Sequence, residues 1–114
     1  MARFYRYETV DIPLQFTPTG VLEGYKHIIV SIAQNGMTQI DKNENDLAID
    51  VYNDTITLSL TQEETAKFAG GQEGAPRKAK IQVNIYYNST ERDVSTVGEI
   101  DVYDNLYRKV INNE

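Results

Sequence analysis

Short stretches in which apolar and polar residues alternate run along most of this chain. A period of two predicts β-strands that turn one face toward a core and the other toward water. Residues 26–34 are apolar on both faces and rich in β-branched residues, which predicts a central strand. The stretches are residues 10–17, 26–34, 37–42, 47–52, 55–60, 79–87 and 94–102.

Turn and breaker residues indicate how these strands are arranged. Pro13 has no N–H to donate to a neighbouring strand, so the strand at residues 10–17 is expected at a sheet edge. Asn35-Gly36 predicts a tight hairpin turn, because both residue types tolerate positive φ. Gly98, inside the last stretch, predicts a β-bulge.

One helical element is expected between strands, at about residues 61–69. Thr61 is expected to cap its start, with the hydroxyl accepting a hydrogen bond from the Glu64 amide. The Glu64 carboxylate is expected to accept one from the Thr61 amide in return. Phe68 is then expected to bring the turn back onto the core.

About seven short strands with one helical crossover predict an all-β fold, an Ig-like antiparallel β-sandwich. We expect an N-terminal arm at residues 1–7, the sandwich at residues 8–103 and a C-terminal tail at residues 104–114. The apolar residues of the tail have helical spacing, in a segment too short to form a stable helix alone.

Composition narrows the classes of partner. The chain has 114 residues, enough for one modest core, and a net charge of −6. This charge disfavours nucleic acid and anionic membrane surfaces as partners, because both attract basic proteins. The chain lacks cysteine, a hydrophobic leader and any apolar run that would span a bilayer, so we expect a cytoplasmic origin.

Two patterns that bind ions or nucleotides in other proteins are incomplete here. Residues 41–52 begin like an EF-hand, but Asp46 and Tyr52 replace its Gly and Glu. A looser calcium site at Asp41, Asp46 and Asp50 is the alternative to a solvated acidic turn. The glycine-rich residues 70–74 lack the Gly-Lys-Ser/Thr ending of a phosphate loop, so a flexible connection is expected.

The sequence offers little for catalysis. His27 is the single histidine, which argues against a zinc site in a chain without cysteine. No serine lies in a nucleophile elbow, so we expect a protein that is not an enzyme and needs no metal or cofactor. Asn88-Ser89-Thr90 matches the glycosylation pattern and is expected to be a chance match in a polar turn.

Both ends of the chain combine aromatic and basic side chains. Such residues are frequent hot spots of protein interfaces, so we expect arms that dock on their own domain or on a neighbouring subunit. An inert tail is the alternative, and stacking on single-stranded nucleic acid is disfavoured by the overall acidity. The candidate interface residues are Arg3, Phe4, Tyr5, Arg6, Tyr7, Tyr107 and Arg108.

Three segments resemble small proteins of tailed bacteriophages and prophages. Residues 28–36 read I-x-V-x-I-x-Q-N-G, residues 56–68 read I-x-L-x-L-T-Q-E-E-T-x-x-F, and residues 80–85 read x-I-Q-V-x-I. The chain is similar in style to the Ig-like N-terminal domain of phage baseplate upper proteins, over roughly residues 9–103. This resemblance implies an Ig-like fold and a virion context, but no active site, and it leaves both termini outside the match.

These expectations combine into one leading hypothesis. The chain is expected to be a non-enzymatic structural protein of a phage virion, made in the bacterial cytoplasm: a head decoration or head-fibre protein, a neck component or part of a baseplate. Its expected partners are other virion proteins and further copies of itself, with no nucleic acid or membrane. The alternative is a module that binds carbohydrate or a host surface through Tyr52, Tyr86 or Tyr103. A host-directed inhibitor is a third option, which the scattered acidic residues disfavour.

Overall fold

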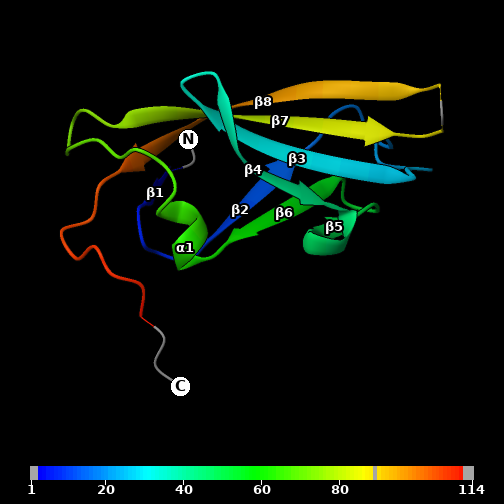
Figure 1. Cartoon of the computed structure of the whole chain (residues 1–114). Coiled ribbons are helices and arrows are strands. Elements are labelled where there is room, and N and C mark those ends of the chain that lie inside the picture. Colours follow the sequence, from blue (N-terminus) through cyan, green and yellow to red (C-terminus); the bar gives the residue numbers. More distant parts are fainter. Residues whose placement is uncertain (1–2, 89, 112–114) are drawn as a thin grey trace.

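Eight strands form two sheets in the part of the chain that the computed structural model describes, residues 3–88 and 90–111 (Figure 1). Of residues 94–97 it describes the backbone alone. The strands are β1 (Arg3–Tyr5), β2 (Val10–Gln15), β3 (His27–Gln34), β4 (Met37–Asn43), β5 (Ala48–Asp50), β6 (Thr55–Leu60), β7 (Arg77–Tyr86) and β8 (Arg92–Tyr103). A 3₁₀-helix, η1 (Glu44–Asp46), precedes β5, and a short helix, α1 (Gln62–Thr65), follows β6.

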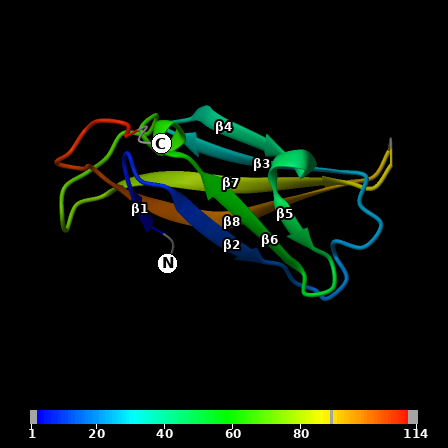
Figure 2. The same cartoon turned by 90° about the horizontal axis from the view of Figure 1, so that it is seen from below.

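The order of the strands is that of an Ig-like β-sandwich. The larger sheet runs β1-β8-β7-β3-β4 and the smaller sheet runs β2-β6-β5. The second, sixth and fifth strands share one sheet, and the third, seventh and eighth share the other, as in immunoglobulin domains. Figure 2 shows the strands of the smaller sheet crossing those of the larger one at an angle. The Ig-like fold expected from the sequence is confirmed.

Local predictions from the turn residues are also confirmed. β2, which contains Pro13, lies at an edge and pairs with β6 alone. β3 is central, with β7 on one side and β4 on the other. Asn35 and Gly36 both have positive φ, 56° and 78°, in the turn between β3 and β4. The register between β7 and β8 shifts beside Gly98, as a bulge requires.

The capping box at α1 is present and is tied to the larger sheet. The Glu64 amide donates to Thr61 Oγ1 at 3.2 Å, and the Thr61 amide donates to Glu64 Oε1 at 2.9 Å. Lys42 of β4 adds an ion pair, with Nζ 2.6 Å from Glu64 Oε2. Burial raises the pKa of Glu64, but Lys42 and the Thr61 amide outweigh it, so the pKa lies below its ordinary value.

The N-terminal end of the chain differs from the sequence prediction. Residues 3–5 form β1, an eighth strand, which pairs in parallel with residues 101–103 of β8. Three residues are too few to display a period of two, so this strand has no signature in the sequence. Residues 104–111 are irregular and not helical, because their large apolar side chains find no core to pack against.

The core lies between the two sheets and reaches up to β1. Phe4 is fully buried, and its ring meets that of Phe68 edge-on, with centroids 5.4 Å apart. The sequence holds neither cysteine nor tryptophan, so this apolar packing replaces the disulfide and tryptophan of antibody domains. The other fully or nearly fully buried residues of the core include Leu22, Ile28, Val30, Ile32, Ile56, Leu58, Ile85, Ile100 and Val102.

Replacing Phe4 with Ala is expected to reduce the free energy of unfolding by about 3–5 kcal/mol, because it leaves a cavity between the sheets. Urea denaturation measures this loss. Its matched control is Arg3→Ala, on the exposed neighbouring position of β1, with an expected change within about 0.5 kcal/mol. If Phe4→Ala fails to fold, Phe4→Leu supplies a milder test. Equal stabilities for the Phe4 and Arg3 variants would contradict the role of β1 in the core.

Candidate functional site

Residues 3–5 of β1 and residues 101–103 of β8 lie side by side at one end of the sandwich (Figure 1). The Arg6 amide donates to the Tyr103 carbonyl at 2.9 Å, directly after the β1–β8 pairing ends. Asn105 Nδ2 donates to the Arg6 carbonyl at 3.0 Å and so holds the start of the C-terminal segment against the N-terminal one. Of the docking modes expected for residues 3–6, docking on their own domain is the one seen in this single chain.

Arg6 and Asp104 form the polar centre of this end. Arg6 Nη1 donates to Asp104 Oδ1 at 3.1 Å, and Nη2 donates to the Ala66 carbonyl just after α1 at 2.9 Å. Arg108 Nη2 donates to the other carboxylate oxygen of Asp104 at 2.9 Å. One carboxylate, directly after β8, therefore joins Arg6, directly after β1, to Arg108 of the C-terminal segment.

The environment of Asp104 favours its ionised form. Partial burial raises the pKa of this carboxyl, but the hydrogen bond from the Asn105 amide and the two guanidinium groups lower it more. The pKa of Asp104 therefore lies below its ordinary value.

Beside this centre lies a cavity of about 450 Å³, which we call the terminal groove. The rings of Tyr5 and Tyr103 stack on one another along it, with centroids 5.3 Å apart and planes at 29°. The groove is lined by Tyr5, Gly71, Gln72, Glu73, Tyr103, Asp104, Asn105, Leu106 and Arg108.

The glycine-rich loop forms one wall of the groove and packs directly on the end of β8. The Gly71 amide donates to the Val102 carbonyl at 3.0 Å, and the Asp104 amide donates to the Gly71 carbonyl at 2.8 Å. A Cβ at Gly70 would lie 2.6 Å from the Asp104 nitrogen, and one at Gly71 would lie 2.1 Å from the Ala75 oxygen. These glycines therefore serve close backbone contact, which the expectation of a flexible connection did not include.

The C-terminal segment is anchored a second time, on α1. Gln62 Nε2 donates to the Ile111 carbonyl at 3.1 Å, and the Ile111 amide donates to Gln62 Oε1 at 2.9 Å. Between its two anchors the segment exposes Leu106 fully and Tyr107 to 58%, and Ile111 itself is 48% exposed. We call these three residues the terminal patch.

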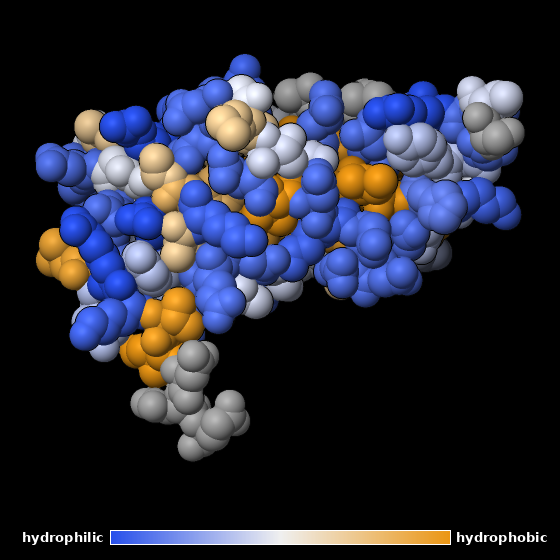
Figure 3. Space-filling model, viewed as in Figure 1, coloured by the Kyte–Doolittle hydropathy of each residue, from blue (hydrophilic) through white to orange (hydrophobic). Residues whose placement is uncertain are grey.

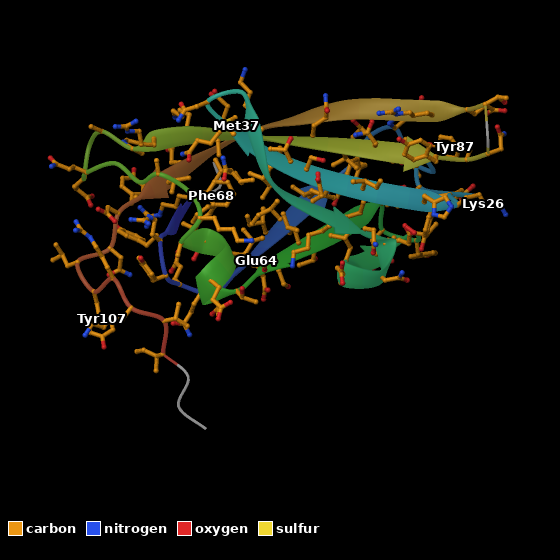
Figure 4. All side chains as sticks on the ribbon, in the orientation of Figure 1. Lys26, Met37, Glu64, Phe68, Tyr87 and Tyr107 are labelled. Carbon is orange, nitrogen blue, oxygen red and sulfur yellow. The ribbon has the colours of Figure 1, made fainter. Side chains whose placement is uncertain are left out.

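Figure 3 shows separate hydrophobic areas at the left and at the lower left of the molecule, with hydrophilic surface between them. Figure 4 shows Tyr107 on the C-terminal segment, beyond the end of the sheets.

The residues singled out in the sequence therefore have unequal roles. Phe4 belongs to the core and is not exposed to solvent, whereas Tyr5 and Arg108 line the terminal groove. Arg6 holds Asp104, and Tyr7 lies under the Arg6 guanidinium, 5.2 Å from ring centre to Cζ. Arg3 is exposed on β1.

Sequence reasoning gave no role at this site to Leu106, Gln62, Asp104 or Glu73. For Leu106 a signal was present, since a large apolar residue stands in a polar segment outside any strand alternation. The contacts of Gln62 and Asp104 have no such signal, because each joins segments far apart in the chain.

The acidic residues and the histidine considered for metal binding lie apart from this end. Among the described residues no group of three or more His, Asp or Glu side chains is placed to hold a metal ion. Asp41 accepts a hydrogen bond from Ser31, and Asp50 accepts from Asn53. His27 is exposed and pairs with Glu44, and this hydrogen bond holds the pKa of Glu44 below its ordinary value.

The tyrosines considered for sugar stacking are differently placed. Tyr52 is 92% exposed in the turn after β5. The Arg92 guanidinium lies over the ring of Tyr86, 4.9 Å from its centre, and Tyr103 stacks on Tyr5. Tyr86 and Tyr103 therefore each have one ring face covered by another residue of the chain.

No protein-family profile and no curated protein matches this sequence. Among solved structures, the chain is similar to the Ig-like domain of mouse leukocyte-associated immunoglobulin-like receptor 1, crystallised as a strand-swapped dimer. The two are 13% identical with a TM-score of 0.44, over 88% of this chain and 84% of that one. Within the described residues, no helix has the length and apolar character to cross a membrane.

Replacing Asp104 with Asn is expected to lower the unfolding temperature by a few degrees near pH 7, because the lowered pKa stabilises the fold wherever the carboxylate is ionised. This stabilisation is complete above the unfolded-state pKa of about 3.9 and disappears as pH falls through the lowered folded-state pKa. Calorimetry of both proteins from about pH 2.5 to pH 7 should therefore show the difference shrinking in acid. Glu63→Gln, on the exposed face of α1, is the control. A difference for Asp104→Asn that is the same at every pH would contradict the assignment.

Proposed function

We propose that this chain is a non-enzymatic structural module that docks onto other proteins through the terminal patch. One observation carries the proposal: three large hydrophobic side chains are exposed on one segment that is anchored at both ends. Apolar groups exposed together on a soluble protein mark interaction sites more often than isolated ones do.

Anchoring matters for affinity. A loose tail loses conformational entropy when it binds, whereas a segment already held by Gln62 and Asn105 loses less. The chemistry of the patch also suits protein contact, since tyrosine and arginine are enriched among hot-spot residues and Tyr107 and Arg108 are neighbours here.

The phage context of the proposal comes from the resemblance of the three sequence segments. Those segments correspond to β3 with its hairpin turn, to β6 with α1, and to β7. Their residues build the sandwich, whereas the terminal patch lies outside them. We therefore propose a virion protein whose scaffold is shared with phage proteins and whose docking residues are its own, with other virion proteins as partners.

Carbohydrate binding is the less favoured function. Stacking on a sugar needs an open aromatic face, and Arg92 and Tyr5 cover one face each of Tyr86 and Tyr103. Tyr52 is open, but it lies in a turn away from both the groove and the patch.

The test is incorporation into particles of the phage or prophage that encodes this chain. We expect purified particles to contain the protein, and Leu106→Ser combined with Tyr107→Ser to reduce its copies per particle by more than about tenfold, because hot-spot side chains each contribute about 2 kcal/mol or more. Quantitative mass spectrometry of the particles measures the copy number.

The matched control is Met37→Ser with Tyr52→Ser, which removes two exposed hydrophobic side chains elsewhere on the surface. It is expected to leave incorporation unchanged. Both double variants must accumulate as folded protein in the lysate. Particles that lack the wild-type protein would refute the virion role, and equal incorporation of the two double variants would refute docking through the patch.

A further inference from the structure

We infer that the terminal groove receives Leu106 from a second copy of this chain, so that two copies bind each other about a two-fold axis. This inference rests on the proposed function, because it names a partner for the same patch. Its central observation is that Leu106 stands at the rim of the groove yet is fully exposed, so the groove is left without an apolar occupant from its own chain.

The lining of the groove suits an apolar side chain better than a polyhydroxyl ligand. Both polar ends of the Asn105 side chain are engaged, with Nδ2 donating to the Arg6 carbonyl and Oδ1 accepting from the Tyr107 amide. Both oxygens of Asp104 already accept hydrogen bonds from Arg6 and Arg108. Gln72, Glu73 and Arg108 add polar groups to the rest of the lining, but the accessible lining is more apolar than polar, and the two stacked tyrosine rings offer apolar area.

The charges at the rim are self-complementary. Glu73, on the glycine-rich loop, is exposed, and Arg108, on the C-terminal segment, has a side chain that is 61% exposed. Both line the groove from different walls. A two-fold axis through the rim places Arg108 of each copy toward Glu73 of the other, because an isologous interface pairs residue i with j and j with i.

Self-association of this protein needs opposite charges that face each other at the contact. With a net charge of −6, two copies repel each other at long range. Opposite charges at the contact offset that repulsion and fix the register, whereas the inserted Leu106 supplies the apolar contact. A small contact of this kind is typical of a weak dimer. The dimer becomes highly populated where many copies are held close together, because their effective concentration is high.

The experiment is sedimentation velocity of the full chain over a wide concentration range. The wild-type mass is expected to rise from the 13.0 kDa of one chain toward twice that value as concentration increases. Glu73→Arg alone and Arg108→Glu alone should each weaken the dimer by about tenfold or more, since each places like charges together. The double variant Glu73→Arg/Arg108→Glu should return the dissociation constant to within about threefold of wild type, because it restores opposite charges.

Two further variants test the effect of net charge and the effect of Leu106 separately. Asp46→Arg, on η1, changes the net charge as Glu73→Arg does and is expected to leave the dimer no weaker than wild type. Leu106→Lys leaves the Arg108–Asp104 ion pair in place and is expected to abolish the dimer. It keeps the test decisive if Arg108→Glu disturbs the fold beside Asp104.

A wild-type chain that stays monomeric at all concentrations would overturn the inference, as would a dimer that Leu106→Lys does not weaken. Failure of the double charge reversal to restore binding would overturn the proposed register. A saccharide that occupies the groove of the monomer, detected as a change in tyrosine fluorescence on a glycan panel, would replace the second copy as its occupant. The particle experiment tests the proposed function separately. A monomer that is incorporated into particles through the terminal patch would support the proposed function and contradict the dimer.

Discussion

Burial of Phe4 in the core, against Phe68, is the contact on which the organisation of one end of the sandwich depends. It places β1 beside the last residues of β8 and so brings the N-terminus to the place where β8 ends. In the chain without disulfides, apolar packing of this kind is what holds the sheets together. Once β1 has paired with β8, Arg6 lies within reach of Asp104. The ion pair between these two residues then holds the start of the C-terminal segment in place.

The consequence is a division between scaffold and surface. The alternating strands, the hairpin turn and the capped helix bury their apolar faces and leave the outer faces mainly polar. Met37 and Tyr52 are exposed singly, whereas the segment after β8 exposes both Leu106 and Tyr107 on a backbone that is held at both ends. Holding apolar side chains in water is unfavourable for an isolated protein. For a protein that binds a partner, a backbone that is already ordered reduces the conformational entropy lost on binding.

Under the proposed virion role, this division lets one chain combine a shared scaffold with a binding function of its own. The three sequence segments on which the proposed phage context rests lie in β3, β6, α1 and β7, which form strands and a capped helix of the sandwich. Residues of the groove come from β1, the glycine-rich loop and the segment after β8. Leu106, Tyr107 and Ile111 are exposed, so changes at these positions leave the buried residues of the core in place.

The sequence by itself determined strands β2 to β8, the Asn35-Gly36 turn and the capping box, because their signals are local: a period of two, positive φ and a spacing of three residues. It also predicts interaction residues at both termini. Only the tertiary structure decided that Phe4 is core, that the glycine-rich loop packs on β8, and that the two ends meet at Asp104. Those contacts join residues far apart in the chain, and their geometry exists only after the sheets have packed.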